Sequence, residues 1–258
     1  MIQTIALVVA CCIQTATENP ATVQFGNWLP RLTGTMKDGE SVDFETNIDL
    51  HDQESTPTVS FSLIPTGDIT MSLSVFDFST SGSGTFSGNR SFGSMTMLSG
   101  DAYRASVGVA SVGLMAAWDT MKPYQTSDTA ALKFAPIAGL QWYGVDSRLE
   151  NVTNDQVVIN NNSWVSMQGG MRVQFNWAMQ ELTSMLDSIS IESQFVAGML
   201  FGGDGGTIWS VQTGVTLHVS PSVAGYFGYL LYELNAENGS YVFDAGLQGL
   251  YLGGEFRF

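Results

Sequence analysis

Few residues in this chain are of the types that carry catalytic chemistry. The 258 residues include two histidines, His51 and His218, and two adjacent cysteines, Cys11 and Cys12. A serine beside a histidine can act as nucleophile and base, and Ser60 with His51 is the candidate pair for a lipid-modifying enzyme. No zinc-binding HExxH, phosphate-binding P-loop or Cys/His metal spacing occurs. We therefore predict a protein that is not an enzyme and needs no cofactor, and keep the lipid-modifying enzyme as an alternative.

Carboxylates form a dense cluster near the start of the chain. Seven of the 24 Asp and Glu residues fall within residues 38–54. They are Asp38, Glu40, Asp43, Glu45, Asp49, Asp52 and Glu54. We interpret this segment as a solvated loop that faces the medium. Carboxylate oxygens are ligands for Ca²⁺ and Mg²⁺, so divalent cations are possible partners of the loop, although the spacing is irregular.

Charge and hydropathy indicate a chain whose surface is not entirely in water. Nine Lys and Arg against 24 acids give a net charge of −15 without a basic patch, which argues against nucleic-acid binding. Apolar residues make up 44% of the chain and charged residues only 13%, about half the charged fraction of soluble domains. No stretch reaches the ~18–20 apolar residues of a membrane-spanning helix. An ordinary all-β globule and a transmembrane β-barrel remain.

Residues 165–180 alternate strictly between an apolar and a polar face. The odd-numbered positions from Val165 to Met179 are apolar apart from Gly169, and the even-numbered ones include Ser166, Gln168 and Arg172. That period predicts a strand and excludes a helix. Nine other segments have strand-like patterns: 23–36, 57–65, 69–79, 102–119, 129–147, 188–199, 207–219, 222–235 and 250–258. We predict about ten strands, with eight or twelve as alternatives.

Connection lengths and face composition favour a barrel over a soluble sandwich. Short turns should gather at one end with both termini, and the long connections 37–56, 80–100 and 148–162 at the other. A sandwich also alternates, but its polar face meets water and should be rich in Lys and Glu. Here the polar faces are mostly Ser, Gln, Asn, Gly and Thr, which suit a confined interior. We predict an all-β fold, a closed antiparallel transmembrane β-barrel, because an open edge would leave backbone groups unpaired in lipid.

Six charged residues are assigned to the lumen from their positions on the polar faces. They are Arg104, Lys133, Arg172, Glu192, Glu255 and Arg257. Opposite charges in a narrow interior should pair, for example Arg172 with Glu192, because an isolated buried charge is unfavourable. The pairs predict a salt-bridged filling of the lumen, and pore-lining charges that set selectivity are the alternative. A ten-stranded lumen lies between filled eight-stranded barrels and open porins.

The first 21 residues have the pattern of a secretion signal. An apolar run at 5–13 is followed by small residues that suit cleavage, although no Lys or Arg precedes it. The stretch Val8–Cys11 also looks like a lipoprotein cleavage box that would lipidate Cys11, and cleavage between residues 12 and 21 is the preferred reading. We therefore divide the chain into a signal segment, 1–21, and one barrel domain, 22–258.

The end of the chain resembles the C-terminal signature of bacterial outer-membrane barrels. That signature has an aromatic last residue, another aromatic third from the end and apolar residues at alternate positions before them. Leu250, Leu252, Phe256 and Phe258 match it, whereas Gly254 departs from it. The segments 26–36, 57–65 and 81–97 are similar in style to uncharacterised planctomycete-type members of the small porin-like and OmpA-like barrels. The resemblance implies that the barrel-assembly machinery and outer-membrane lipid are partners.

These observations together give one expectation for function and two alternatives. The expected protein is a bacterial outer-membrane β-barrel with both termini in the periplasm, structural in role and with a filled or narrow lumen. The first alternative is a small porin or channel for ions or small solutes. The second is the lipid-modifying enzyme named above.

Overall fold

The computed structural model describes residues 21–50, 52–66, 68–119, 124–127, 129–179 and 185–258. The predicted signal segment lies outside these residues except for Ala21, so the interpretations of Cys11 and of the cleavage site are not addressed by the structure. The position of His51 is likewise outside the described residues.

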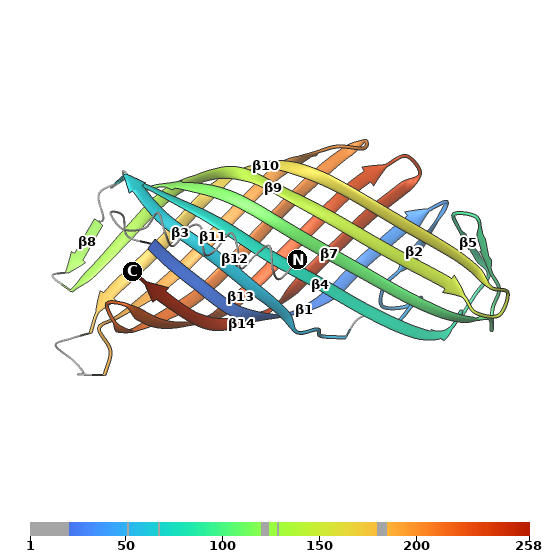
Figure 1. Cartoon of the computed structure of the whole chain (residues 1–258), viewed down its shortest axis with the longest axis horizontal. Helices are drawn as coiled ribbons and strands as arrows, with labels where there is room; N and C mark the ends of the chain where they lie inside the picture. Colours follow the sequence, from blue (N-terminus) through green and yellow to red (C-terminus); the bar gives the residue numbers. More distant parts are fainter. Residues whose placement is uncertain (1–20, 51, 67, 120–123, 128, 180–184) are drawn as a thin grey trace.

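The described residues form a closed antiparallel barrel of ten strands, as the alternation predicts (Figure 1). The strands are β1 (Ala21–Asp38), β3 (Thr56–Thr66), β4 (Ile69–Thr85), β7 (Ala102–Trp118), β9 (Ala130–Asn151), β10 (Gln156–Ala178), β11 (Ser188–Phe201), β12 (Gly205–Ser220), β13 (Val223–Asn238) and β14 (Tyr241–Arg257). Each strand pairs with the next one along the chain, and β14 pairs with β1 to close the ring. Phe258 donates its backbone N–H to the carbonyl of Ala21 at 2.9 Å, so the closing pair extends to the last residue.

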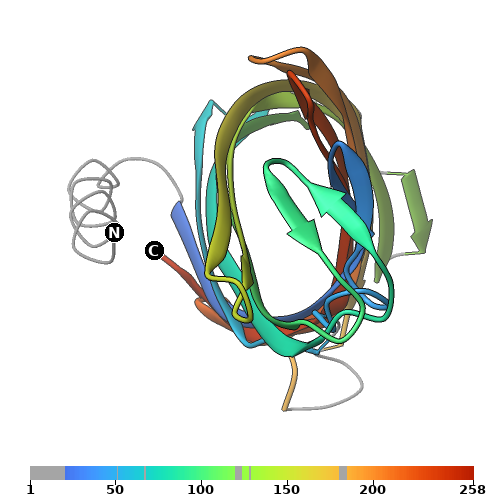
Figure 2. The same ribbon diagram turned by 90° about the vertical axis from the view of Figure 1, so that its right-hand side faces the viewer.

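Four short strands lie off this ring. β2 (Glu40–Asp43) folds back on the end of β1, and β8 (Tyr124–Ser127) pairs with the start of β9. β5 (Arg90–Phe92) and β6 (Met95–Met97) form a separate hairpin that lies across the mouth of the barrel (Figure 2). β2 and β5 are at one end of the barrel, and β8 and the C-terminus are at the other (Figure 1). We call these the loop end and the terminus end.

The outer surface of the barrel carries a belt of exposed apolar side chains. On β10, Val165 and Met167 are 44% and 57% exposed, whereas Ser166 and Gln168 on the opposite face are buried. A soluble protein would show the reverse, so this surface is suited to lipid. Large exposed apolar residues of the belt include Phe25, Leu114, Leu140, Trp142, Met171, Phe195, Trp209, Phe227, Leu250 and Leu252. Within the described part of the chain, no helix is long and apolar enough to cross a membrane.

The barrel wall continues beyond this belt at the loop end. Outward positions there become charged and include Asp77 on β4, Asp146 on β9 and Asp244 on β14. The predicted long connection at 148–162 is wrong for this reason: β9 and β10 continue as a hairpin whose turn is only residues 152–155. β14 likewise begins at Tyr241, well before the predicted start at 250. In both places charged or polar residues such as Asp146 and Arg148 on β9 and Asp244 on β14 face outward, so the apolar alternation that marks the belt is interrupted.

Candidate functional site: the barrel lumen

The loop-end half of the lumen is filled with apolar side chains. Its most buried members are at most 1% exposed and come from seven wall strands, three short strands and the segment after β2. They are Trp28, Leu32, Met36, Val42, Phe44, Ile48, Leu50, Phe78, Phe92, Met95, Met97, Val107, Tyr143, Val145, Leu149, Trp164, Ala236 and Phe243. We call this cluster the apolar plug. An apolar cross-section without water opposes ion passage.

Part of the plug comes from a segment that replaces a strand in the wall. β3 is short: its last pairing with β1 toward the loop end is Thr56 with Trp28. Beyond that level, residues 44–50 lie between β1 and β4, and we call them the wall segment. The Phe44 N–H donates to the Gly34 carbonyl of β1 at 3.0 Å. On the other side, Gly82 of β4 faces the carbonyls of Ile48 and Asp49 closely enough that a Cβ there would overlap both.

The wall segment changes the interpretation of the acidic loop. All seven of its carboxylate residues are exposed or half-buried, but the apolar residues between them are not: Val42, Phe44, Ile48 and Leu50 are at most 1% exposed. The carboxylates lie at the surface, but the segment is more than a solvated loop, because its apolar side chains are buried in the plug. The apolar residues between the acids were the available signal for a buried inner side. Among the described residues, no three His, Cys, Asp or Glu side chains gather as a metal site, and cation binding stays a prediction.

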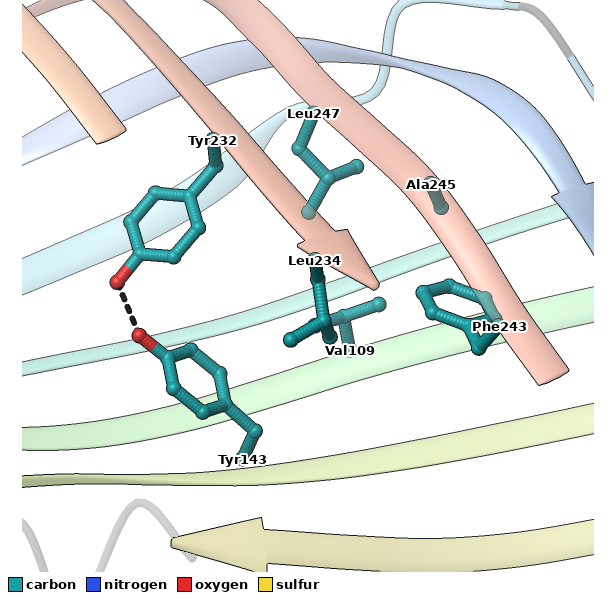
Figure 3. Close-up of a pocket in the computed structure, with 7 residues that line it drawn as sticks. All are labelled: Val109, Tyr143, Tyr232, Leu234, Phe243, Ala245 and Leu247. Carbon is teal, nitrogen blue, oxygen red and sulfur yellow. Dashed lines mark hydrogen bonds between the residues drawn. The ribbon is translucent and has the colours of Figure 1, made fainter. Parts of the chain in front are cut away.

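A layer of hydrogen bonds crosses the lumen beside the plug. The hydroxyls of Tyr143 on β9 and Tyr232 on β13 meet at 2.5 Å across the interior (Figure 3). Gln168 donates to the Tyr143 hydroxyl at 3.0 Å, and Gln141 donates to Ser111 at 2.7 Å. The cavity lined by the seven residues of Figure 3 has a volume of about 10 Å³, about the space of one water molecule. These contacts tie opposite walls together and leave little free space.

Two buried tyrosines outside the belt support the absence of charge in the plug. Burial raises the pKa of Tyr241 to about 12, although a hydrogen bond with Ser147 at 3.1 Å partly opposes the shift. The pKa of Tyr103 is also raised, mainly by burial and further by the negative charge of Asp49. Both hydroxyls therefore remain neutral throughout the physiological range.

The terminus-end half of the lumen has a different lining. Inward residues there are largely polar and only half-buried, including Ser72, Ser74, Gln194 and Gln212. A small apolar cluster of Ala117, Ala135, Ile137 and Val196 interrupts this lining on one side. Side chains that point inward and yet retain exposed surface indicate interior space open to water. The two halves of the lumen thus differ in both polarity and packing.

Asp119 is the centre of a charged cluster in this half. Its carboxylate accepts from Lys133 at 2.9 Å, from Arg172 at 3.1 Å and from the Thr70 hydroxyl at 2.8 Å. Asp119 is the partner of Arg172, not Glu192 as the sequence suggested, and Glu192 lies inward on β11 near enough to interact with Arg172 electrostatically. Sequence reasoning missed Asp119. The sequence did contain a signal for it: the odd-numbered residues of β7 face inward, and residue 119 continues that series.

Arg104 is not in the lumen, so its assignment there is wrong. On β7, the buried neighbours Tyr103 and Ala105 face inward, whereas Arg104 is exposed on the same face as Val112 and Leu114. The inward face of this strand was difficult to predict from the sequence because Ala, Gly, Ser and Val occur on both faces. Arg104 lies beyond the apolar belt, where an outward charge is solvated.

Glu255 organises a second polar group at the terminus end. Its carboxylate accepts from Arg257 at 2.7 Å and from Gln24 at 2.7 Å. Ser60, the candidate nucleophile from the sequence, donates to the Gln24 side-chain oxygen at 3.0 Å. Since residue 51 lies outside the described residues, the Ser60–His51 pair is not tested. The contacts of Ser60 are those of a lumen-lining hydroxyl.

His218 lies beside another serine. Its Nε2 is 3.1 Å from the Ser190 hydroxyl, a distance that suits a nucleophile and its base. However, the Ser190 hydroxyl donates to the Asn176 side-chain oxygen at 2.7 Å, so its proton is directed away from the imidazole. The buried Nδ1 of His218 has no hydrogen-bond partner in the described part of the chain, so no third group orients the ring. This arrangement lacks the geometry of an activated serine.

The wall, the belt and the lumen are those of a membrane barrel. The described chain is a closed antiparallel β-barrel. No family model and no curated protein matches it. The similar solved structures include the outer-membrane protease OmpT of Escherichia coli, with a TM-score of 0.49, 8% identity and coverage of 93% of this chain and 97% of that one.

Two further solved structures are similar to this chain over most of its length. The attachment invasion locus protein Ail of Yersinia pestis has a TM-score of 0.40, 10% identity and coverage of 94% of this chain and 100% of that one. The translocator domain of the autotransporter NalP of Neisseria meningitidis has a TM-score of 0.41, 9% identity and coverage of 100% and 95%. All three are bacterial outer-membrane barrels, and the likeness concerns architecture alone.

Proposed function

We propose that this chain is a structural envelope protein of a bacterial outer membrane whose lumen is closed in its resting state. The apolar plug is the observation that carries the proposal. Its members are at most 1% exposed and reach the interior from opposite walls. A hydrated ion would have to lose its water in this section without gaining polar ligands in return.

The proposed orientation places both termini in the periplasm and the loop end in the medium. It is supported by the position of the apolar belt, which covers the terminus-end part of the wall and leaves the loop end in water. The charged outward residues Asp77, Asp146 and Asp244 lie on that projecting part. The acidic loop then faces the side where divalent cations would meet it.

Assembly by the barrel-assembly machinery is also part of the proposal. The four signature residues face outward on the closing strand: Leu250, Leu252, Phe256 and Phe258 are 58%, 53%, 39% and 65% exposed. Phe256 stacks on Phe25 of the paired strand with ring centroids 5.6 Å apart. The stripe is thus available to lipid in the folded barrel and to an assembly factor before closure.

A small channel is the second candidate function, and the polar terminus-end half of the lumen favours it. Asp119, Lys133 and Arg172 line a half-buried interior of the kind that can hold ions and water. The lipid-modifying enzyme has weaker support, because the Ser190–His218 pair is not arranged for activation. We therefore propose no catalytic role.

Conductance in a planar bilayer tests the closed lumen. Purified chain is inserted, and its folding is checked independently by the shift in gel mobility that heat-denatured barrels show. We expect no steady current steps from the inserted wild-type protein. Stepwise conductance that scales with the amount of inserted barrel would overturn the proposal in favour of the channel.

A further inference from the structure

One stretch of β10 has a neighbouring strand on only one side. β9 pairs with β10 along the whole hairpin down to its turn, whereas β11 pairs with β10 only from Val165, which is opposite Phe201. The β9–β10 hairpin therefore extends beyond the β11–β12 hairpin at the loop end (Figure 1). The β11–β12 turn ends beside Ser163, whose carbonyl oxygen would be 3.3 Å from a Cβ on Gly202. Residues 157–162 lie beyond that turn.

The register shows which backbone groups of this stretch have no neighbouring strand to bond. Along an antiparallel strand, successive residues direct their backbone groups alternately to the two sides. The Met179 N–H donates to the Asp187 carbonyl at 2.9 Å in continuation of the β10–β11 ladder, so the odd-numbered residues of β10 bond toward β11. At Val157, Ile159 and Asn161 that side is empty, and no backbone group in the described part of the chain bonds them there. We call these three residues the open edge.

The open edge lacks the features that usually protect an exposed strand. Charged side chains, prolines and bulges commonly block pairing at the edge of a sheet. Residues 156–164, QVVINNNSW, contain no charge and no proline, and no bulge interrupts their register with β9. Val157 and Ile159 are β-branched, which favours a strand, and are 40% and 55% exposed. Backbone and side chains therefore both suit the addition of an extended segment.

The charges around the open edge indicate what kind of segment would bind. Five acidic residues that retain exposed surface flank it, on β9, in the β9–β10 turn, in the β11–β12 turn and at the end of β13: Asp146, Glu150, Asp155, Asp204 and Glu237. The end of β13 is close by, because Asn238 donates to the Asn162 side chain of β10 at 2.6 Å.

Two arginines lie on the same outer face, but both are beside one of these acids. Arg148 contacts Glu150 at 2.9 Å, and Arg104 is opposite Glu150 in the β7–β9 register. The remaining excess of negative charge favours a basic partner. It disfavours a second copy of this chain, whose own edge would carry the same carboxylates.

We propose that the open edge is a docking site for an extended basic segment of a protein outside the cell, which adds to β10 as a strand on the side that β11 leaves free. Its backbone pairs with Val157, Ile159 and Asn161, its apolar side chains cover the first two, and its Lys or Arg side chains meet the flanking carboxylates. The inference goes beyond the proposed function and does not depend on whether the lumen conducts. Only the location of the partner outside the cell rests on the proposed orientation.

Peptide binding to the folded full chain in detergent tests the docking site. The probe is a capped, fluorescein-labelled peptide, Lys-Lys-Val-Thr-Val-Thr-Val-Lys-Lys, and binding is followed by fluorescence anisotropy. The matched control is the same peptide with its valines N-methylated, which removes backbone donors and keeps every side chain and charge. We expect saturable binding of the probe and at least tenfold weaker binding of the N-methylated peptide. A probe with Glu in place of every Lys should also bind at least tenfold more weakly.

Two variants of one residue test the protein side of the contact. Ile159→Pro removes an N–H that points away from β9, so the β9–β10 ladder keeps its bonds, and proline is tolerated at such edge positions. Ile159→Thr keeps that N–H and a β-branched side chain. We expect Ile159→Pro to weaken binding of the probe at least tenfold and Ile159→Thr to change it by less than about threefold. Gel mobility checks that each variant is folded, and Val157→Pro replaces Ile159→Pro if the latter does not fold.

The outcomes are independent of the conductance that tests the closed lumen. The absence of saturable probe binding to the folded wild type would overturn the docking site and leave the proposed function standing. Equal binding of the N-methylated peptide or of the Glu peptide, or an equal loss in Ile159→Thr and Ile159→Pro, would also overturn it, because the contact would then not be a basic strand paired through its backbone. A wild-type dimer in analytical ultracentrifugation that Ile159→Pro abolishes would overturn the peptide partner in favour of a second copy.

Discussion

The two halves of this barrel use the same strands with opposite rules for polarity. On β14, Phe243 at the loop end faces a dry apolar interior, and Asp244 beside it faces water. Eight residues further along the same strand, Tyr251 faces a partly open interior, and Leu250 and Leu252 face outward in the belt. Alternation along a strand shows that its two faces differ in polarity. Which face is apolar depends on whether lipid or water surrounds the barrel at that level.

Glycines show how differently the two interiors are packed. The ring of Tyr251 lies over Gly214 and Gly228, where an added Cβ would come within 2.1 Å and 2.6 Å of its side-chain atoms. The ring thus occupies space that the two glycines leave free, and many of the residues around it are only half-buried. Phe243 instead is 1% exposed and contacts Phe44 of the plug with ring centroids 5.8 Å apart. One half is filled by close packing, and the other half leaves room for water.

The largest expected difference between the halves comes from removing an inward ring from each. Phe243→Ala should destabilise the barrel by about 3–5 kcal/mol, because it leaves a cavity in a dry core. Tyr251→Ala, on the same strand and face, should lower stability by about half as much or less, because water can enter the space it leaves. Urea unfolding in detergent measures both.

Equal losses for the two variants would contradict the comparison, since they would mean that the terminus-end half is as dry as the plug. Tyr251→Phe is a suitable control for the hydroxyl, which donates to the Thr213 carbonyl at a long 3.4 Å. We expect this change to have little effect on unfolding.

A charge placed on the outer face should distinguish the belt from the projecting wall. Val173 and Ile159 both face outward on β10, but Val173 is within the belt and Ile159, at 55% exposed, is on the part beyond it. Val173→Arg should destabilise by roughly 2–4 kcal/mol in a bilayer if the position is near the midplane. Ile159→Arg should be nearly neutral, because an outward Arg there is solvated.

Refolding into lipid vesicles, followed by urea titration, gives both values. A similar penalty at residue 159 would show that the membrane extends to the loop end, and no penalty at residue 173 would show that β10 is not in a bilayer. Gln174→Arg, which faces the lumen beside Val173, separates a membrane effect from a general effect of arginine on the strand.

The sequence was most informative where lipid imposes a strict pattern. All ten wall strands were predicted, some because apolar and polar residues alternate strictly, as in 165–180, and others from a less regular strand-like pattern between turn-rich connections. The first part of β14 and the β9–β10 hairpin beyond the belt were missed. There the apolar residues face inward and polar residues face outward, which reverses the pattern of the belt, so the alternation does not continue from one part of the strand to the other. Arg104 was assigned to the wrong face for a related reason, because small residues occupy both faces of β7.

The contents of the lumen were harder to predict because they depend on contacts between distant segments. Val42, Phe44, Ile48 and Leu50 are apolar residues in an acidic stretch, and only the short β3 explains why they fill the wall and the plug. Asp119 follows the last residue of β7, and its partners Lys133 and Arg172 belong to other strands. The sequence predicted that opposite charges would pair in the interior, but which residues pair depends on the register between neighbouring strands, which the sequence did not show.

The smallest expected effect concerns the Asp119 cluster, where the hydration of the terminus-end half can be measured directly. Asp119→Asn removes the charge that Lys133 and Arg172 share, while the amide keeps nearly the same shape. Breaking a dry pair typically costs about 3–5 kcal/mol, whereas an exposed pair contributes about 0–1 kcal/mol. Asp119 is 9% exposed, and its two partners are 26% and 18% exposed, so an intermediate loss of about 1–3 kcal/mol is expected.

The salt dependence of this stability loss tests whether the cluster is in contact with water. In a hydrated interior, the difference between wild type and Asp119→Asn should shrink when unfolding is measured in 1 M rather than 0.1 M salt, because mobile ions screen the charges. Arg172→Gln and the double variant complete a mutant cycle that isolates the Asp119–Arg172 term. A coupling that is large and independent of salt would mean that the cluster is sealed from water, and the contrast between the two halves would then be one of polarity but not of hydration.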